Sequence, residues 1–172
     1  MSRSALIRAG GIIAMVGGIL RAAASFAPGA GSDIDRQMLY LAIDVFLLLG
    51  LLGFYELRYQ DVGRAGAFGF VLALFGLMVV RSSRAIPGLD LYPVGAIAFT
   101  GGLIVLCGSA WRVKTLAIWV PTAFVVSTLV GLVGTVAANS EWLVVVSGVL
   151  FGAAFAGLGR EVWSASAVSD RD

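Results

Sequence analysis

The chain alternates between long apolar stretches and short segments that carry its charged residues. Six stretches are long enough to cross a hydrocarbon core of about 30 Å, which needs roughly 17 to 25 helical residues. None has the polar stripe of a soluble amphipathic helix, and unbroken apolar runs such as 45–52 lack the alternation of a barrel strand. The pattern predicts an all-α polytopic membrane protein, with six transmembrane helices in a compact bundle. The expected spans are 6–26, 39–55, 65–86, 92–111, 116–138 and 142–158.

Composition supports a membrane environment. Of the 172 residues, 59% are apolar and only 13% are charged, whereas soluble domains carry about 25% charged residues. So little charge could not cover six apolar segments in water, which excludes a soluble enzyme, a nucleic-acid-binding protein and a disordered chain. We expect one transmembrane domain over 1–163, and a polar C-terminal tail over 164–172 without stable structure.

Aromatic and basic residues indicate how the chain is threaded. All eight Trp and Tyr residues fall within a few positions of a span end, as amphipathic rings at the headgroup level do. Both termini lie on one side if there are six crossings, and eight of the twelve Lys and Arg residues fall on that side. The positive-inside rule therefore predicts a multi-pass membrane protein with both termini in the cytoplasm.

The residue counts remove most catalytic chemistry. The chain has no histidine, so imidazole-based catalysis and His-ligated metal centres are excluded. Its one cysteine, Cys107, lies inside an apolar run and is interpreted as an inert packing residue. No phosphate-binding loop or dinucleotide fingerprint is present. We therefore expect no enzyme activity, no cofactor and no metal site.

Small residues recur at four-residue spacing in four of the expected helices, a pattern that lets helix backbones approach closely in a bilayer. We interpret these faces as packing surfaces within the chain. Alternatively, they pack against a partner subunit or a second copy of the chain; membrane lipids are expected partners as well. The central glycines of the faces are Gly18, Gly69, Gly131, Gly148 and Gly152.

One polar group of residues lies within the expected spans. Counting about 1.5 Å per residue places Arg21, Asp44 and Arg81 at a similar depth, roughly 6 to 8 Å below the outer boundary of the core, with Arg84 one turn above Arg81. Intramembrane charges are costly unless paired or hydrated. The four residues predict an outward-facing pocket for an anionic ligand or a lipid headgroup. The alternative is a structural Arg21–Asp44 ion pair, with both remaining arginines reaching to the interface.

The first and third expected helices begin with the same short sequence. Arg8-Ala-Gly and Arg64-Ala-Gly, 56 residues apart, open the first and third expected helices. This suggests three repeated helical hairpins, although the positive-inside rule alone also places arginines there. With the opening run 8–18 and the run 50–55 closing the second helix, the chain resembles small bacterial six-helix membrane proteins. Its three-hairpin plan is similar to that of the HdeD acid-resistance proteins, which implies a bacterial inner membrane but transfers no site residue.

Two classes of function follow. The first is a non-enzymatic structural or accessory membrane protein that acts through its helix-packing faces on lipids or a partner complex. The second is a small-solute binding or transport component that uses the predicted Arg/Asp pocket.

Overall fold

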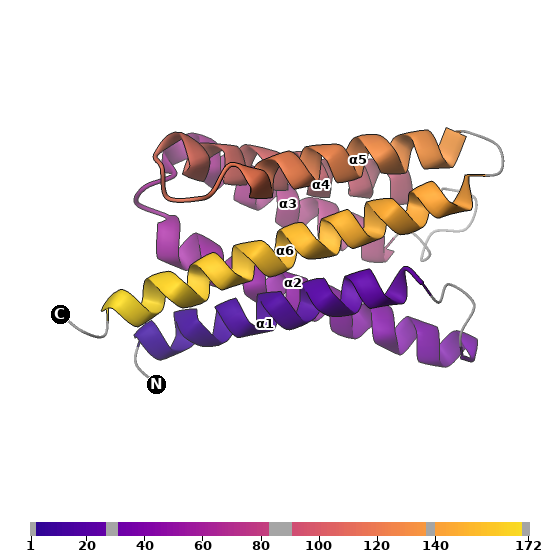
Figure 1. Ribbon diagram of the computed structural model, residues 1–172, viewed down its shortest axis with the longest axis horizontal. Helices are drawn as coiled ribbons and strands as arrows, with labels where there is room; N and C mark the ends of the chain where they lie inside the picture. Colours follow the sequence, from indigo (N-terminus) through magenta and orange to yellow (C-terminus); the bar gives the residue numbers. More distant parts are fainter. Residues whose placement is uncertain (1–2, 27–30, 83–90, 137–139, 170–172) are drawn as a thin grey trace. The chain divides into compact units, whose positions relative to one another are not determined.

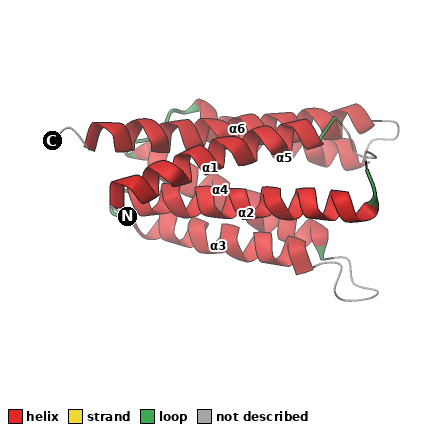
Figure 2. Ribbon diagram, turned by 90° about the horizontal axis from the view of Figure 1, so that it is seen from below, coloured by secondary structure: helices red, strands yellow, loops and turns green. Residues whose placement is uncertain are grey.

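The computed structural model describes residues 3–26, 31–82, 91–136 and 140–169, and every regular element in these ranges is an α-helix (Figures 1 and 2). This confirms the predicted all-α class. The helices are α1 (Arg3–Ala24), α2 (Asp33–Arg58), α3 (Gly63–Ser82), α4 (Tyr92–Arg112), α5 (Trp119–Val136) and α6 (Glu141–Ser169).

Five of the helices, α1 to α4 and α6, are long and apolar enough to cross a membrane. The chain is therefore a multi-pass membrane protein by the length and composition of its helices. The described apolar part of α5, Trp119–Gly134, is shorter than a typical span, whereas the sequence predicted a full crossing over 116–138.

Two helix ends differ from the prediction by six residues or more. Helix α2 begins at Asp33, six residues before the expected span, because Ser32 caps it. Helix α6 continues to Ser169, whereas the sequence suggested a tail without stable structure from residue 164. Val162 is fully buried, and the Trp163 ring lies 5.7 Å from the guanidinium carbon of Arg8 in α1. Packing against α1 therefore extends the helix beyond the apolar stretch.

The chain divides into two compact units. Unit 1 consists of Met1–Leu57 and Thr122–Asp172, and so contains α1, α2, α6 and most of α5. Unit 2 consists of Arg58–Pro121 and contains α3 and α4.

In unit 1, α1 packs antiparallel on both α6 and α2 through glycine and alanine. A Cβ at Gly11 would lie 2.8 Å from the Trp163 backbone nitrogen, and Gly18 faces Gly152 further along. The start of α1 therefore lies beside the end of α6, as the chain termini in Figure 1 show. On α2, Gly50 faces the fully buried Ala14.

Helices α5 and α6 meet through a polar contact and an aromatic cluster. The Ser127 hydroxyl donates to the backbone carbonyl of Ser147 across the two helices at 2.9 Å. One turn before Ser127, the Phe124 ring packs edge-on against Phe151 and Phe155, with centroids 5.3 and 6.1 Å apart. Phe124 and Phe155 are completely buried, so this cluster forms part of the core of unit 1.

Unit 2 is an antiparallel hairpin with a tight small-residue seam. A Cβ at Gly69 would lie 2.6 Å from the Leu106 backbone nitrogen, and one at Gly95 the same distance from that of Val80. Gly76 faces the backbone of Phe99 between these points. Because the added atoms would meet main chain rather than movable side chains, the seam requires glycine.

The opposite side of α3 is apolar and exposed. Its large side chains recur at helical spacing on one face, each with about three-fifths or more of its surface accessible: Phe68 (63%), Val71 (62%), Phe75 (59%) and Met78 (70%). An exposed stripe of this kind suits contact with lipid tails or with another apolar surface.

Candidate functional site

Two polar side chains of unit 1, Arg21 and Ser25, lie where the C-terminal end of α1 faces Gly148 in the first half of α6. Arg21 is half-buried in the last turn of α1, and its Nη1 donates a hydrogen bond to the Ser25 hydroxyl at 3.0 Å. The same hydroxyl donates back to the Arg21 backbone carbonyl, also at 3.0 Å. These two bonds hold the guanidinium along the end of its own helix.

Gly148 of α6 provides the room for this pair. A Cβ at position 148 would overlap with the Ser25 hydroxyl oxygen and lie 3.1 Å from Arg21 Nη1. A polar pair therefore occupies part of the α1–α6 seam that elsewhere is filled by backbone and alanine. We call Arg21, Ser25 and Gly148 the α1–α6 polar site.

The polar site continues onto α5 through the residue beside Gly148. The Ser147 backbone carbonyl accepts the bond from Ser127, and a Cβ at Gly131 would lie 2.7 Å from the Ser147 hydroxyl oxygen. Ser127 is only 3% exposed. Polar groups of three helices thus share one level of unit 1, each accommodated by a small neighbour.

Asp44, the acidic residue of the predicted pocket, belongs to α2, which packs beside α1. The pairing of α1 with α2, in which Gly10 faces Gly53 and Gly50 faces Ala14, places Asp44 within about one turn of Arg21 along the helices. Asp44 is half-buried and has an interaction of its own. Within the described part of the chain, the Arg21 guanidinium donates to the hydroxyl of Ser25.

The remaining residues of the predicted pocket lie elsewhere in the chain. Arg81 is exposed in the last turn of α3, belongs to unit 2 and has an interaction of its own. Arg84 lies outside the described residues. The α1–α6 polar site therefore includes one of the four predicted pocket residues, Arg21.

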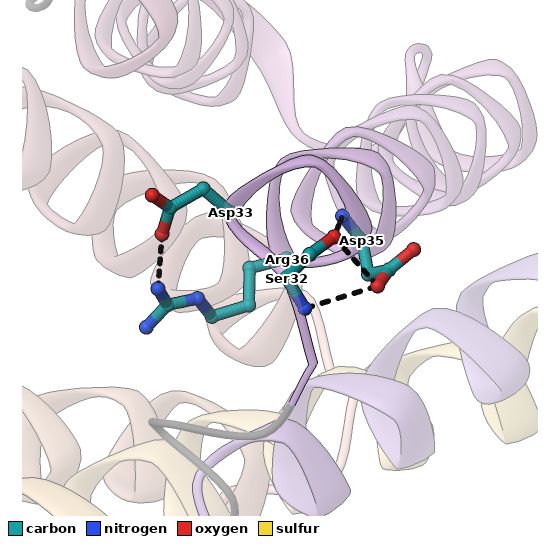
Figure 3. Close-up of polar contacts among 4 residues, drawn as sticks. All are labelled: Ser32, Asp33, Asp35 and Arg36. Atoms are coloured by element: carbon teal, nitrogen blue, oxygen red, sulfur yellow. Dashed lines mark hydrogen bonds and ion pairs between the residues drawn. The ribbon is translucent and has the colours of Figure 1, made fainter.

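The start of α2 carries a separate exposed polar cluster (Figure 3). The Asp35 carboxylate accepts bonds from the Ser32 backbone N–H at 3.0 Å and from its hydroxyl at 2.7 Å, while the Asp35 N–H donates to the Ser32 hydroxyl. Asp33 and Arg36 form an ion pair one residue further along. The reciprocal bonds form a capping box, which satisfies backbone donors that the first helical turn leaves unpaired.

All five glycines singled out in the sequence lie against another helix. Gly18 and Gly152 face each other across α1 and α6, and Gly69 faces α4. Gly148 and Gly131 face polar side chains instead of backbone. The small-residue faces are thus occupied by contacts within this chain.

Sequence reasoning missed Ser25 and Ser147 as members of the polar region. Ser25 follows Arg21 by four residues, the spacing at which helical side chains meet, so this contact could have been found. The place of Ser147 depends on the register of α5 against α6, for which the sequence carries no local signal.

The chemistry available at the α1–α6 polar site is anion recognition. A guanidinium has five N–H donors, arranged to match carboxylate or phosphate oxygens. Within the described residues, one donor bonds Ser25. No group of three or more His, Cys, Asp or Glu side chains suited to a metal ion occurs in the described part of the chain.

Comparisons with known proteins find no match: no protein-family model fits the chain, and neither a curated protein nor a solved structure is similar to it. The likeness to the HdeD proteins therefore rests on architecture and composition alone.

Proposed function

We propose that this chain is a non-enzymatic multi-pass protein of structural or accessory type, resident in a bacterial inner membrane with both termini in the cytoplasm. It acts on membrane lipids or on a membrane partner, including a second copy of itself. The exposed apolar stripe of α3 carries the proposal, because its large side chains stay accessible while the small residues of the same helix pack against α4.

The outward face of α3, and not the small-residue seams, then contacts lipids or a partner. Phe75 is 59% exposed, whereas Ala73, two residues away, is fully buried against α4. A partner that binds this helix in the membrane would meet aromatic and methionine side chains, which adapt well to apolar surfaces.

A photo-crosslinking amino acid at Phe75, in cells, tests this function. We expect adducts to a membrane protein of defined mass, to a second copy of the chain, or to lipid. The same amino acid at the exposed Leu129 of α5 is the control, since a specific partner of α3 would not label there. Saturable uptake of a solute into proteoliposomes, with no effect of replacing the α3 stripe, would contradict the proposal.

The α1–α6 polar site favours a second candidate, a component that binds an anionic solute. The supporting observation is the half-buried Arg21 guanidinium oriented by Ser25. An anion bound there should stabilise the protein through mass action. Thermal unfolding in detergent with added carboxylate or phosphate compounds tests it: stabilisation that disappears in R21Q supports this function, and none in the wild type contradicts it.

A further inference from the structure

Helix α4 ends in a turn that normally uses glycine. The Thr115 N–H donates to the Ala110 carbonyl at 3.0 Å, and the Lys114 N–H donates to the Trp111 carbonyl at 2.8 Å. This pair of bonds defines a Schellman motif, whose key residue adopts a left-handed conformation. That residue is Lys114, with a φ of 58°.

The left-handed conformation is energetically unfavourable for lysine. Among the described residues Lys114 is the one non-glycine with positive φ, whereas Gly63, at the start of α3, meets a similar φ of 59° without a Cβ. A side chain in the left-handed region crowds the following carbonyl. Glycine or asparagine would close the same turn with less strain, so the lysine side chain itself calls for an explanation.

Lys114 is one of three exposed basic residues at the same end of unit 2. In the α3–α4 hairpin, Gly76 faces Phe99 and Gly69 faces Leu106. Continuing this antiparallel register brings the first turn of α3, with Arg64, level with the last turn of α4, with Arg112. Arg64, Arg112 and Lys114 are all exposed. We call these three residues the basic end of unit 2.

Few acidic residues lie close to the basic end along the chain. Asp61 is the one carboxylate among the described residues of unit 2, and its closest cation is Arg58, with Nη1 3.5 Å from Oδ2. The three charges of the basic end therefore form a cationic patch, which attracts an anionic partner.

Apolar side chains flank the patch at the end of α4, on its connection to α5 and at the start of α5. About half of the surface of each is accessible: Trp111 (45%), Val113 (45%), Ile118 (55%) and Trp119 (46%). Tryptophan favours the headgroup layer, where its ring lies among acyl chains and its N–H stays hydrated. Basic residues interleaved with exposed tryptophan and aliphatic side chains match the lipid–water interface better than they match bulk water.

We propose that the basic end of unit 2 binds the headgroups of anionic phospholipids, and that Lys114 contacts the headgroup phosphate. This inference rests on the proposed action on lipids and names the class of lipid. Anionic headgroups are attracted by about 1 kcal/mol per nearby basic residue, so losing one should weaken binding about fivefold.

Variants of Lys114 separate the charge from the backbone strain. K114G removes both, K114A removes the charge and keeps the strain, and K114R keeps both. Because K114G relieves the strain, we expect it to melt roughly 2 to 4 °C higher in lipid-free detergent. We expect K114G and K114A to bind phosphatidylglycerol about fivefold more weakly than wild type, and K114R to match wild type.

Native mass spectrometry of the full chain in detergent, titrated with phosphatidylglycerol and with phosphatidylcholine, measures the affinities. R112Q tests a second residue of the basic end and should weaken phosphatidylglycerol binding similarly. R36Q, at the exposed Asp33–Arg36 pair of α2, is the matched control and should leave it unchanged. Inorganic phosphate as competitor distinguishes a lipid site from a site for the free anion: displacement of lipid at equal concentration would overturn the lipid assignment.

Wild-type phosphatidylglycerol affinity in both K114G and K114A would overturn the proposal, as would equal losses for the two lipids. Either result leaves crosslinking from Phe75 on α3 unaffected, so the lipid assignment and the proposed function can fail separately.

Discussion

Gly101 and Gly102 of α4 are adjacent in the chain but differ in what a side chain would meet. A Cβ at Gly102 would lie 2.6 Å from the Gly69 carbonyl oxygen and 2.8 Å from the Ala73 Cα, both in α3. A Cβ at Gly101 would have no atom within 4 Å. The substitutions G101A and G102A add the same methyl group to the interior of one helix, so a difference between them measures the α3–α4 contact.

The size of the effect follows from these distances. Ordinary contact of a Cβ begins at 3.4 Å, so relieving the overlap with the Gly69 oxygen requires a shift of about 0.8 Å between the two backbones. Overpacking of a tight interface costs about 1 to 3 kcal/mol. The helix-propensity gain of Gly to Ala, about 1 kcal/mol, applies to both variants and cancels. We therefore expect G101A to be more stable than G102A by about 1 to 3 kcal/mol.

Unfolding in mixed micelles, followed by the loss of helical circular dichroism, gives the free energies of both variants. G101A should equal or exceed wild type, because nothing opposes its methyl group. Stabilities of G101A and G102A that agree within about 0.5 kcal/mol, the usual size of a surface effect, would refute the close backbone approach of α3 and α4.

Three further substitutions test other contacts. S127A removes the hydroxyl that bonds the Ser147 carbonyl and should cost about 0.6 kcal/mol, the average for such bonds in membranes, and at most about 1.7 kcal/mol; an unchanged free energy of unfolding would place that hydroxyl elsewhere. S32A removes the α2 cap and should cost about 0.5 to 2 kcal/mol, with hydrogen exchange accelerating in the first turn of α2 alone; uniform protection would contradict the capping box. G148A should destabilise the α1–α6 seam, and S25A should restore much of the loss in a double-mutant cycle; independent effects would separate the two residues.

Hydropathy predicts the helices well where a span ends in charge or turn residues. Helix α4 was expected over 92–111 and runs from Tyr92 to Arg112, because Pro93 suits a first turn and Arg112 marks the interface. Hydropathy misplaces a helix end where the helix continues beyond its apolar stretch. Helix α6 continues past Leu158 because Val162 is buried, and hydropathy does not register that packing.

For the candidate site, the sequence predicts how far along its helix each residue lies. It does not predict in which direction around the helix the side chain points. The helical rise places Asp44 near the level of Arg21, and the packing of α1 against α2 agrees. Direction around the helix depends on which residues pack: Ile43 is buried in unit 1, and Asp44, the next residue, points about 100° away from it. Arg21 donates to Ser25, the residue directly after the end of its own helix. A depth count therefore identifies candidate partners but does not choose among them.

One sequence pattern, a small residue every fourth position, has two physical outcomes in this chain. Gly18 and Gly152 meet backbone, so an added methyl group must push two helices apart whatever the neighbouring side chains do. Gly148 meets the polar pair of Arg21 and Ser25, so an added methyl group there competes with side chains that can be shortened. Only the second kind of glycine can be rescued by trimming its neighbour. Rescue, rather than the size of the destabilisation, therefore distinguishes a glycine that brings helices together from one that makes room for a half-buried polar pair.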